Sequence, residues 1–226
     1  MKGNSKMNRR FIHSVVFASA VVILLCGSAF AKDGDGVNAG FGSVMGQLST
    51  AEVIPAGAID IGPYFGFYED ATALFGRFCV GLVSSMQLEV KSGILDTDGF
   101  DDPGFMIGSG VQFQIVRANR LQMPDMAMDV EFEYYDFGED VSEWVLGSGF
   151  IASYPLRLSN NAKLTPYGRL GIRIESISVG DYDDTDFDIG MNLGAQYAPG
   201  KRLQFFGELQ FDDQVGVIAG VNFAIY

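Results

Sequence analysis

The sequence has little histidine, little cysteine and few basic residues. Its 226 residues include one histidine, two cysteines, and 15 lysines and arginines against 28 acidic residues, for a formal net charge of −13. A chain this acidic lacks the basic surface that nucleic acids require, so we expect no nucleic-acid partner. The length suits one domain of about 200 residues with enough chain for a core. None of these counts excludes a membrane protein.

The first 31 residues have the three parts of a secretory signal peptide. Four basic residues occur within the first ten positions, an apolar stretch covers 11–25, and Ala29-Phe-Ala31 is a small-x-small cleavage site. We therefore expect export and cleavage after Ala31. A lipid on Cys26 is less favoured, because Leu25 stands where lipoprotein signals have a small residue. An uncleaved anchor is disfavoured because the apolar stretch is shorter than the roughly 20 residues of a membrane span.

Removal of residues 1–31 takes away His13, Cys26 and four bases, which leaves 11 bases against 28 acids and a net charge of −17. The remaining cysteine, Cys79, has no partner for an internal disulfide. Without histidine the chain has no Ser-His-Asp triad, Cys-His pair or His-ligated zinc site. We therefore expect that the protein is not an enzyme. Catalysis by carboxylates alone is the enzymatic alternative that stays open.

No second long apolar stretch follows the signal. Instead, segments of about ten residues alternate apolar and polar side chains and end in turns or acidic stretches, as β-strands do. In 58–68, for example, Ile59, Ile61, Phe65 and Phe67 share one parity. The pattern predicts about ten strands, with eight or twelve if a boundary is misplaced, at 58–68, 72–82, 86–95, 105–116, 126–135, 144–154, 164–175, 187–197, 203–211 and 215–226.

The charges distinguish a soluble sheet from a membrane barrel. A membrane barrel turns apolar side chains toward lipid and polar side chains toward its lumen, the reverse of a soluble barrel. Every charge within the expected strands lies on the less apolar face, together with glutamines and glycines. We therefore predict a lumen lined by Asp60, Arg77, Glu89, Lys91, Asp129, Glu131, Glu133, Arg169, Arg173, Glu175, Asp188 and Glu208.

The connections between strands carry a second charge pattern. Those after odd-numbered strands hold sixteen acids and no base, whereas those after even-numbered strands hold six bases and one acid, Asp125. Successive connections in an up-and-down barrel alternate between its two ends. The pattern predicts an acidic rim facing outward and a basic rim facing the periplasm. The acidic connections contain Glu69, Asp70, Asp96, Asp98, Asp101, Asp102, Asp136, Glu139, Asp140, Glu143, Asp181, Asp183, Asp184, Asp186, Asp212 and Asp213.

These features together resemble the bacterial outer-membrane β-barrel proteins, in particular small porin-like or OmpA-like barrels. The resemblance covers about residues 50–226 and includes a final strand that ends on the aromatic Tyr226. It departs from the usual pattern because Val217, Phe223 and Ile225 have the opposite parity from Tyr226. The resemblance implies an all-β, antiparallel, up-and-down transmembrane barrel in the bacterial outer membrane. It also implies membrane lipids, lipopolysaccharide and the outer-membrane insertion machinery as partners.

We therefore divide the chain into a signal peptide (1–31), a periplasmic lead-in or partial plug (32–57) and a barrel (58–226). Closing the sheet removes its edges and satisfies the backbone in hydrocarbon, so no disulfide is needed. Four bases and eight acids in the lumen favour a salt-bridged interior with a structural role or limited passage of cations. The alternative is a surface-binding, adhesin-like barrel that acts through its acidic loops.

We expect no cofactor, apart from weak binding of divalent cations at two acidic clusters. Oxygen ligands of this kind suit Ca²⁺, although neither cluster matches the twelve-residue calcium loop with its closing glutamate. Solvated acidic loops are the simpler explanation. The two clusters are Asp96, Asp98, Asp101 and Asp102, and Asp181, Asp183, Asp184 and Asp186.

Overall fold

The computed structural model describes residues 43–98, 102–117, 123–138, 140–158, 161–212 and 214–225. The expected signal peptide and the first part of the lead-in lie outside these ranges, as do Asp101, Glu139, Asp213 and Tyr226. Among the described residues no helix is long and apolar enough to cross a membrane.

Eleven strands follow one another in the described part of the chain. The sequence-based strand boundaries agree with them to within one or two residues at most ends. The strands are β1 (Ile59–Tyr68), β2 (Ala71–Val83), β3 (Met86–Thr97), β4 (Gly104–Val116), β5 (Asp125–Gly138), β6 (Val141–Ser153), β7 (Leu156–Arg157), β8 (Lys163–Val179), β9 (Tyr182–Ala198), β10 (Leu203–Phe211) and β11 (Val215–Ile225).

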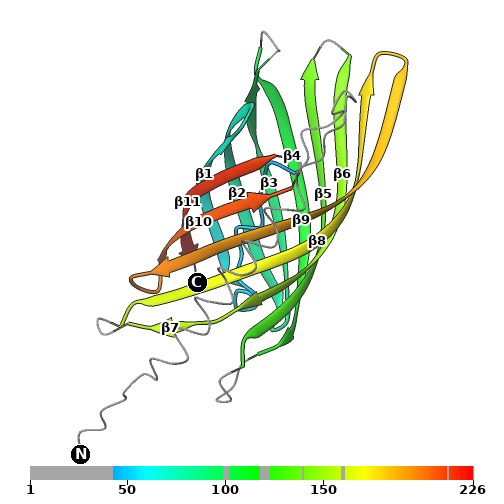
Figure 1. Cartoon of the computed structure of the whole chain (residues 1–226). Helices are drawn as coiled ribbons and strands as arrows, with labels where there is room; N and C mark the ends of the chain where they lie inside the picture. The colour runs from blue at the N-terminus through cyan, green and yellow to red at the C-terminus, as the bar shows by residue number, and fades with distance from the viewer. Residues whose placement is uncertain are drawn as a thin grey trace, which may run out of the picture. The chain divides into compact units, whose positions relative to one another are not determined.

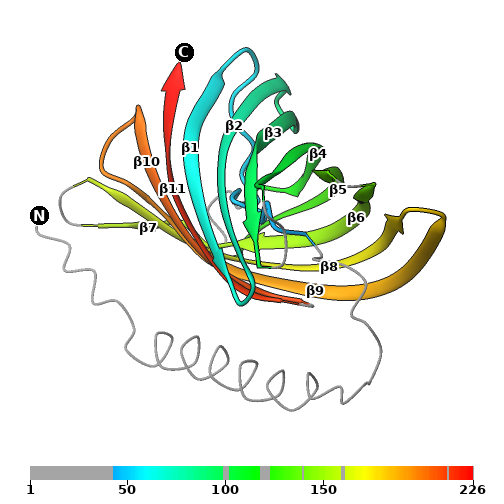
Figure 2. The same cartoon turned by 90° about the horizontal axis from the view of Figure 1, so that it is seen from above.

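The strands close into an antiparallel barrel. Consecutive long strands pair with one another, β6 pairs with β8, and β1 pairs with β11 through Ile59 opposite Ile225. The short strand β7 pairs only with the start of β8, so ten of the described strands form the wall. Figure 1 and Figure 2 show the tilted strands around a common axis. The predicted up-and-down barrel of about ten strands is confirmed.

The two faces of each strand differ as the alternation requires. On β5, Met128, Val130 and Phe132 are 43–49% exposed on the outer surface, while Asp129 and Glu131 between them are buried inside. Side chains alternate faces along a strand, so one strand supplies both a lipid-facing apolar row and a charged lumen row. The outer surface is therefore apolar and suited to contact with membrane lipids.

The hairpin of β8 and β9 is longer than the sequence predicted. We expected residues 176–186 to form a connection, but β8 continues to Val179 and β9 begins at Tyr182, leaving a turn at Gly180 (φ +59°). Polar residues there pair across the hairpin, including Ser178 opposite Asp183 and Ser176 opposite Thr185. Backbone pairing with a neighbouring strand does not need apolar side chains once the hairpin extends beyond the lipid. The hairpin stands out at the right of Figure 1.

Several acids assigned to connections also lie within strands. Asp96 lies in β3, Asp136 in β5 and Glu143 in β6, and Asp125 is the first residue of β5. Glu143 and Asp125 are buried. The turns are tighter than expected, because pairing continues to Gly138 opposite Val141 at the end of the β5–β6 hairpin.

Candidate functional site

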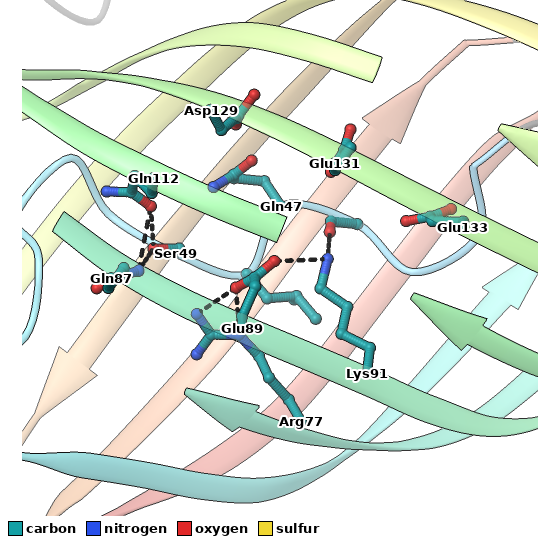
Figure 3. Close-up of polar contacts among 12 residues, drawn as sticks. Gln47, Ser49, Arg77, Gln87, Glu89, Lys91, Gln112, Asp129, Glu131 and Glu133 are labelled. Carbon is teal, nitrogen blue, oxygen red and sulfur yellow. Dashed lines mark hydrogen bonds and ion pairs between the residues drawn. The ribbon is translucent and has the colours of Figure 1, made fainter. Parts of the chain in front are cut away.

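The lumen is filled by charged side chains that form ion pairs across strands. Arg77 on β2 and Lys91 on β3 face one another in register. Glu89 lies between them and accepts hydrogen bonds from Arg77 Nε at 2.9 Å and Nη2 at 2.7 Å, while Lys91 Nζ lies 3.2 Å from its other oxygen. All three side chains are buried (Figure 3). Cys79, on the same face of β2, is buried and free.

A second group spans three strands. Arg169 on β8 reaches over β6 to β5, where its Nε lies 2.8 Å from Asp129 Oδ2 and its Nη2 donates to Glu131. The residues of β6 opposite Asp129 and Glu131 are Gly149 and Gly147. A Cβ at Gly149 would lie 2.4 Å from Arg169 Nε, and one at Gly147 would lie 3.0 Å from Glu131 Oε1. The inward-facing glycines therefore provide the space that these long charged side chains occupy.

The third group lies nearer the acidic rim. Arg173 on β8 donates to Glu175 on its own strand, to Asp188 on β9 at 2.8 Å and to Asp212 after β10 at 2.5 Å. Burial raises the pKa of Asp212, and the positive charge of Arg173 opposes that rise. One guanidinium thus joins two strands and a loop, which is the fork geometry that suits arginine.

The described part of the lead-in occupies the lumen between these groups. Residues 43–51 are all buried, and their backbone bonds to side chains of the barrel wall. Near the acidic rim, Val44 N donates to Tyr135 Oη at 3.0 Å and Val44 O accepts from Tyr68. Farther along, Lys91 Nζ donates to Gly46 O at 2.5 Å. The blue segment among the strands in Figure 2 is this part of the chain.

Toward the basic rim, the same segment bonds to uncharged side chains. Ser49 Oγ donates to Gln112 Oε1 at 2.7 Å, and Gln112 Nε2 donates to Thr50 O at 2.8 Å. Ala51 N donates to Ser153 Oγ at 3.1 Å, and Gln87 accepts from Ile54 N at 2.9 Å. Figure 3 shows the glutamine pair on either side of Ser49. The segment therefore runs along the barrel axis from the acidic to the basic end, and its successive residues bond to the wall along the way.

Glu208 on β10 also binds the backbone of this segment. Its two oxygens accept the backbone N–H groups of Gln47 and Leu48, both at 2.8 Å. The carboxylate also accepts hydrogen bonds from Tyr167 Oη at 2.5 Å and from Asn192 Nδ2 at 2.9 Å. Gly46 (φ +61°) and Leu48 (φ +49°) both adopt the left-handed conformation. This conformation turns successive N–H groups toward one anion, as in the anion-binding turns called nests.

Most of the twelve predicted lumen residues lie buried inside the barrel. Eleven of the twelve are buried, and Asp188 is 27% exposed at the side chain. Glu133 accepts from the Tyr135 hydroxyl, while its other oxygen has no hydrogen-bond partner among the described residues. Asp60 and Glu133 form none of the ion pairs found in the described part of the chain.

The two acidic clusters predicted as weak cation sites are only partly described, because Asp101 of the first cluster lies outside the described residues. No group of three or more His, Cys, Asp or Glu side chains in the described part of the chain could hold a metal ion. Asp183, Asp184 and Asp186 lie in strand β9 and not in a loop. Side chains alternate along a strand, so Asp183 faces away from Asp184 and Asp186. The calcium hypothesis therefore gains no support from this geometry.

The charge pattern of the strands predicts the charged residues of the lumen but not the polar residues that bind residues 43–54, the internal segment. The strand glutamines predicted on the lumen face include Gln87, Gln112 and Gln210, but the sequence does not indicate their partners. Gln210 donates to Ser43 O, 167 residues away. A signal was present, because several uncharged amides on one lumen face can each bond to the backbone of another segment.

Comparisons with known proteins give similarity in fold only. No family model matches, and no curated protein sequence matches. Among solved structures, the N-terminal β-barrel domain of OprF from Pseudomonas aeruginosa has a TM-score of 0.37 and 10% identity, covering 76% of this chain and 100% of that one. The KdgM porin has a TM-score of 0.38 and 9% identity over 74% of this chain and 99% of that one.

The translocator domain of the autotransporter NalP from Neisseria meningitidis has a TM-score of 0.46 and 7% identity, over 76% of this chain and 89% of that one. These TM-scores and identities are low, so the fold is assigned from the closed antiparallel sheet and not from the comparisons. The ten-stranded wall, the apolar outer surface and the charged interior are together the architecture of a bacterial outer-membrane β-barrel.

Proposed function

We propose that this protein is a structural, non-enzymatic barrel of the outer membrane whose lumen is closed by its own residues 43–54. The observation that supports this function is the run of hydrogen bonds between that segment and the wall, from Ser43 to Ile54. A backbone bonded to the wall at this many points leaves little room for solutes. The absence of histidine after residue 31 supports the non-enzymatic role.

The charges of the lumen define what would pass if the segment were removed. Its twelve charged residues are four bases and eight acids. The bases are engaged by neighbouring acids, so the surplus charge along the axis is negative. We propose that any passage through the opened barrel favours cations over anions, because an acidic lining lowers the electrostatic energy of cations in the pore.

Conductance across a planar bilayer tests the proposal. The mature chain should show no stable channels, whereas a variant lacking residues 43–54 should conduct and have a reversal potential that indicates cation selectivity. Each protein is first checked for a shift between the unboiled and boiled forms on a denaturing gel, which reports a folded barrel. Large steady conductance of the mature chain would overturn the closed-lumen function.

A second variant of full length tests the same proposal if the deletion variant does not fold. Glu208→Gln removes the charge that holds Gln47 and Leu48. We expect it to fold and to show intermittent openings that the mature chain lacks. If both variants fold and neither conducts, residues 43–54 do not close the barrel. Anion selectivity in either variant would contradict the cation preference.

A second candidate function is binding through the acidic hairpin of β8 and β9. Pairing between β9 and β10 ends at Met191 opposite Phe211, so Tyr182–Gly190 extend beyond β10. Tyr182 and Asp183 at the tip are exposed. An exposed strand with acidic side chains could recognise a basic partner at the cell surface. Polylysine-coated beads would be the probe, and loss of their binding after deletion of 177–186 would favour this function over a purely structural one.

A further inference from the structure

A recess of about 430 Å³ lies at the basic end of the barrel, where the internal segment leaves the lumen. Its floor is formed by the internal segment and its sides by the turns and strand ends of the wall. The lining residues are Thr50, Glu52, Val53, Ile54, Pro55, Ala56, Ser84, Arg117, Lys163, Gln196, Ala198, Gly200, Lys201 and Gln204.

The charged residues of this lining are mostly basic. Arg117, Lys163 and Lys201 contribute three positive charges, and Glu52 contributes one negative charge. Bases therefore outnumber acids by two among the lining residues, in a protein whose net charge is strongly negative. Like charges gathered in a concave site focus the field and raise the local concentration of counter-ions.

The structure orients two of these cations. Arg117 Nη2 donates to Gln114 Oε1 at 2.9 Å and to Ser84 O at 3.3 Å, which joins the guanidinium to the turn between β2 and β3. Lys163, at the start of β8, is paired with Glu52 of the internal segment. An arginine held in this way has donors to spare, since a guanidinium carries five N–H groups.

Uncharged amides add further hydrogen-bonding groups. Gln196 on β9 and Gln204 on β10 both line the recess and bond to one another, with Gln196 Nε2 at 2.8 Å from Gln204 Oε1. Both side chains have the inward parity of their strands. The recess is therefore lined from the axis of the barrel and from the internal segment, and not from the lipid-facing surface.

We propose that this recess is a binding site for a soluble anion bearing carboxylate or phosphate groups, which it takes up from the side of the basic rim. Charge complementarity supports an anion, and the position inside the wall supports a soluble one over a lipid headgroup. Glu52 competes with such an anion for Lys163, so its removal should strengthen binding. The proposal is independent of whether the barrel conducts.

Isothermal titration of the mature chain with inorganic pyrophosphate, in a neutral detergent at low salt, tests the site. The double variant Arg117→Gln/Lys201→Gln should weaken binding about tenfold or more, because charge-assisted hydrogen bonds are lost. The matched control is Arg157→Gln/Arg202→Gln. These two bases are exposed residues near the same rim and do not line the recess, so this variant should change the affinity less than about twofold.

A third variant gives an effect of opposite sign. Glu52→Gln should tighten the binding of pyrophosphate by a few-fold, because it frees Lys163 while raising the local positive charge. The proposal is overturned if pyrophosphate does not bind, if both double variants weaken binding equally, or if Glu52→Gln weakens it. It is also overturned if only vesicles containing phosphatidylglycerol bind and pyrophosphate does not compete with them, since this would indicate a lipid headgroup site.

Discussion

Glu208 accepts a hydrogen bond from the backbone N–H of Leu48 at 2.8 Å, although the two residues are 160 positions apart in the sequence. The same carboxylate also accepts the N–H of Gln47, and both contacts are buried. A buried carboxylate needs several donors to offset the loss of water, and a backbone segment inside a barrel needs acceptors for its N–H groups. The carboxylate of Glu208 thus gains hydrogen-bond donors, and the backbone N–H groups of the segment gain an acceptor.

Glu208→Gln should loosen the internal segment. The amide keeps one acceptor oxygen but presents its NH₂ group to a backbone N–H, and hydrogen bonds to charged groups contribute about 1.5–3 kcal/mol. We expect Leu48→Cys, in a Cys79→Ala background, to react with a membrane-impermeant maleimide about tenfold faster when Glu208→Gln is added. The control is Glu69→Gln, an exposed acid beyond β1. Equal labelling rates in all backgrounds would show that Glu208 does not hold the segment.

Gly46→Ala should destabilise the protein more than the same change at Gly180. Both glycines have a left-handed backbone, with φ +61° and +59°. A Cβ at Gly46 would lie 2.4 Å from Ile218 Cδ1 and 2.7 Å from Glu208 Oε1, whereas one at Gly180 would meet nothing within 4 Å. The left-handed conformation costs about 1–2 kcal/mol in both variants, and the collision is added only at Gly46.

The measurement for these glycine variants is the temperature at which the unboiled, fast-migrating form disappears on a denaturing gel. We expect a drop of several degrees beyond that of Gly180→Ala, because about 1 kcal/mol shifts the midpoint of a domain this size by about 2–4 °C. A larger effect at Gly180 would be inconsistent with the close packing of the internal segment.

Arg169→Met should strongly destabilise the barrel. The change leaves Asp129 and Glu131 side by side in the lumen without the cation that bonds to both. Removing one partner of a buried ion pair costs about 3–5 kcal/mol, because the remaining charge is uncompensated. Denaturant-induced unfolding in detergent micelles, followed by tryptophan fluorescence of Trp144, would measure the loss of free energy of unfolding. Adding Asp129→Asn and Glu131→Gln should restore much of it, and no recovery would argue against charge repulsion as the cause.

Val130→Arg should destabilise the folded barrel more than Val215→Arg, because the two positions lie at different depths in the membrane. Val130 is 49% exposed on the outer face in the middle of β5, and Val215 is 48% exposed at the start of β11 beside the acidic rim. An arginine at the bilayer midplane costs about 2–4 kcal/mol, and one near the interface costs about 0–1 kcal/mol. Refolding into lipid vesicles at graded denaturant concentrations would compare Val130→Arg with Val215→Arg. Equal costs at the two positions would contradict a membrane-spanning β5.

Local pattern was enough to predict the strands and their two faces. On β5, the alternation of Met128, Asp129, Val130 and Glu131 assigns each side chain to lipid or lumen, because the two-residue period is a property of any strand. The same alternation failed at the β8–β9 hairpin. There, Asp183 and Asp184 lie in a strand whose pairing depends on the neighbouring strand and not on an apolar face.

The sequence by itself determined the type of protein, because apolar and charged side chains alternate along strands long enough to close a barrel around a charged lumen. Only the tertiary structure decided which charges pair and what fills the lumen. Arg169 meets Asp129 because two glycines of an intervening strand leave room, and Glu208 meets Leu48 because the chain passes back through its own barrel. Such contacts join residues far apart in the sequence, so no local period can encode them.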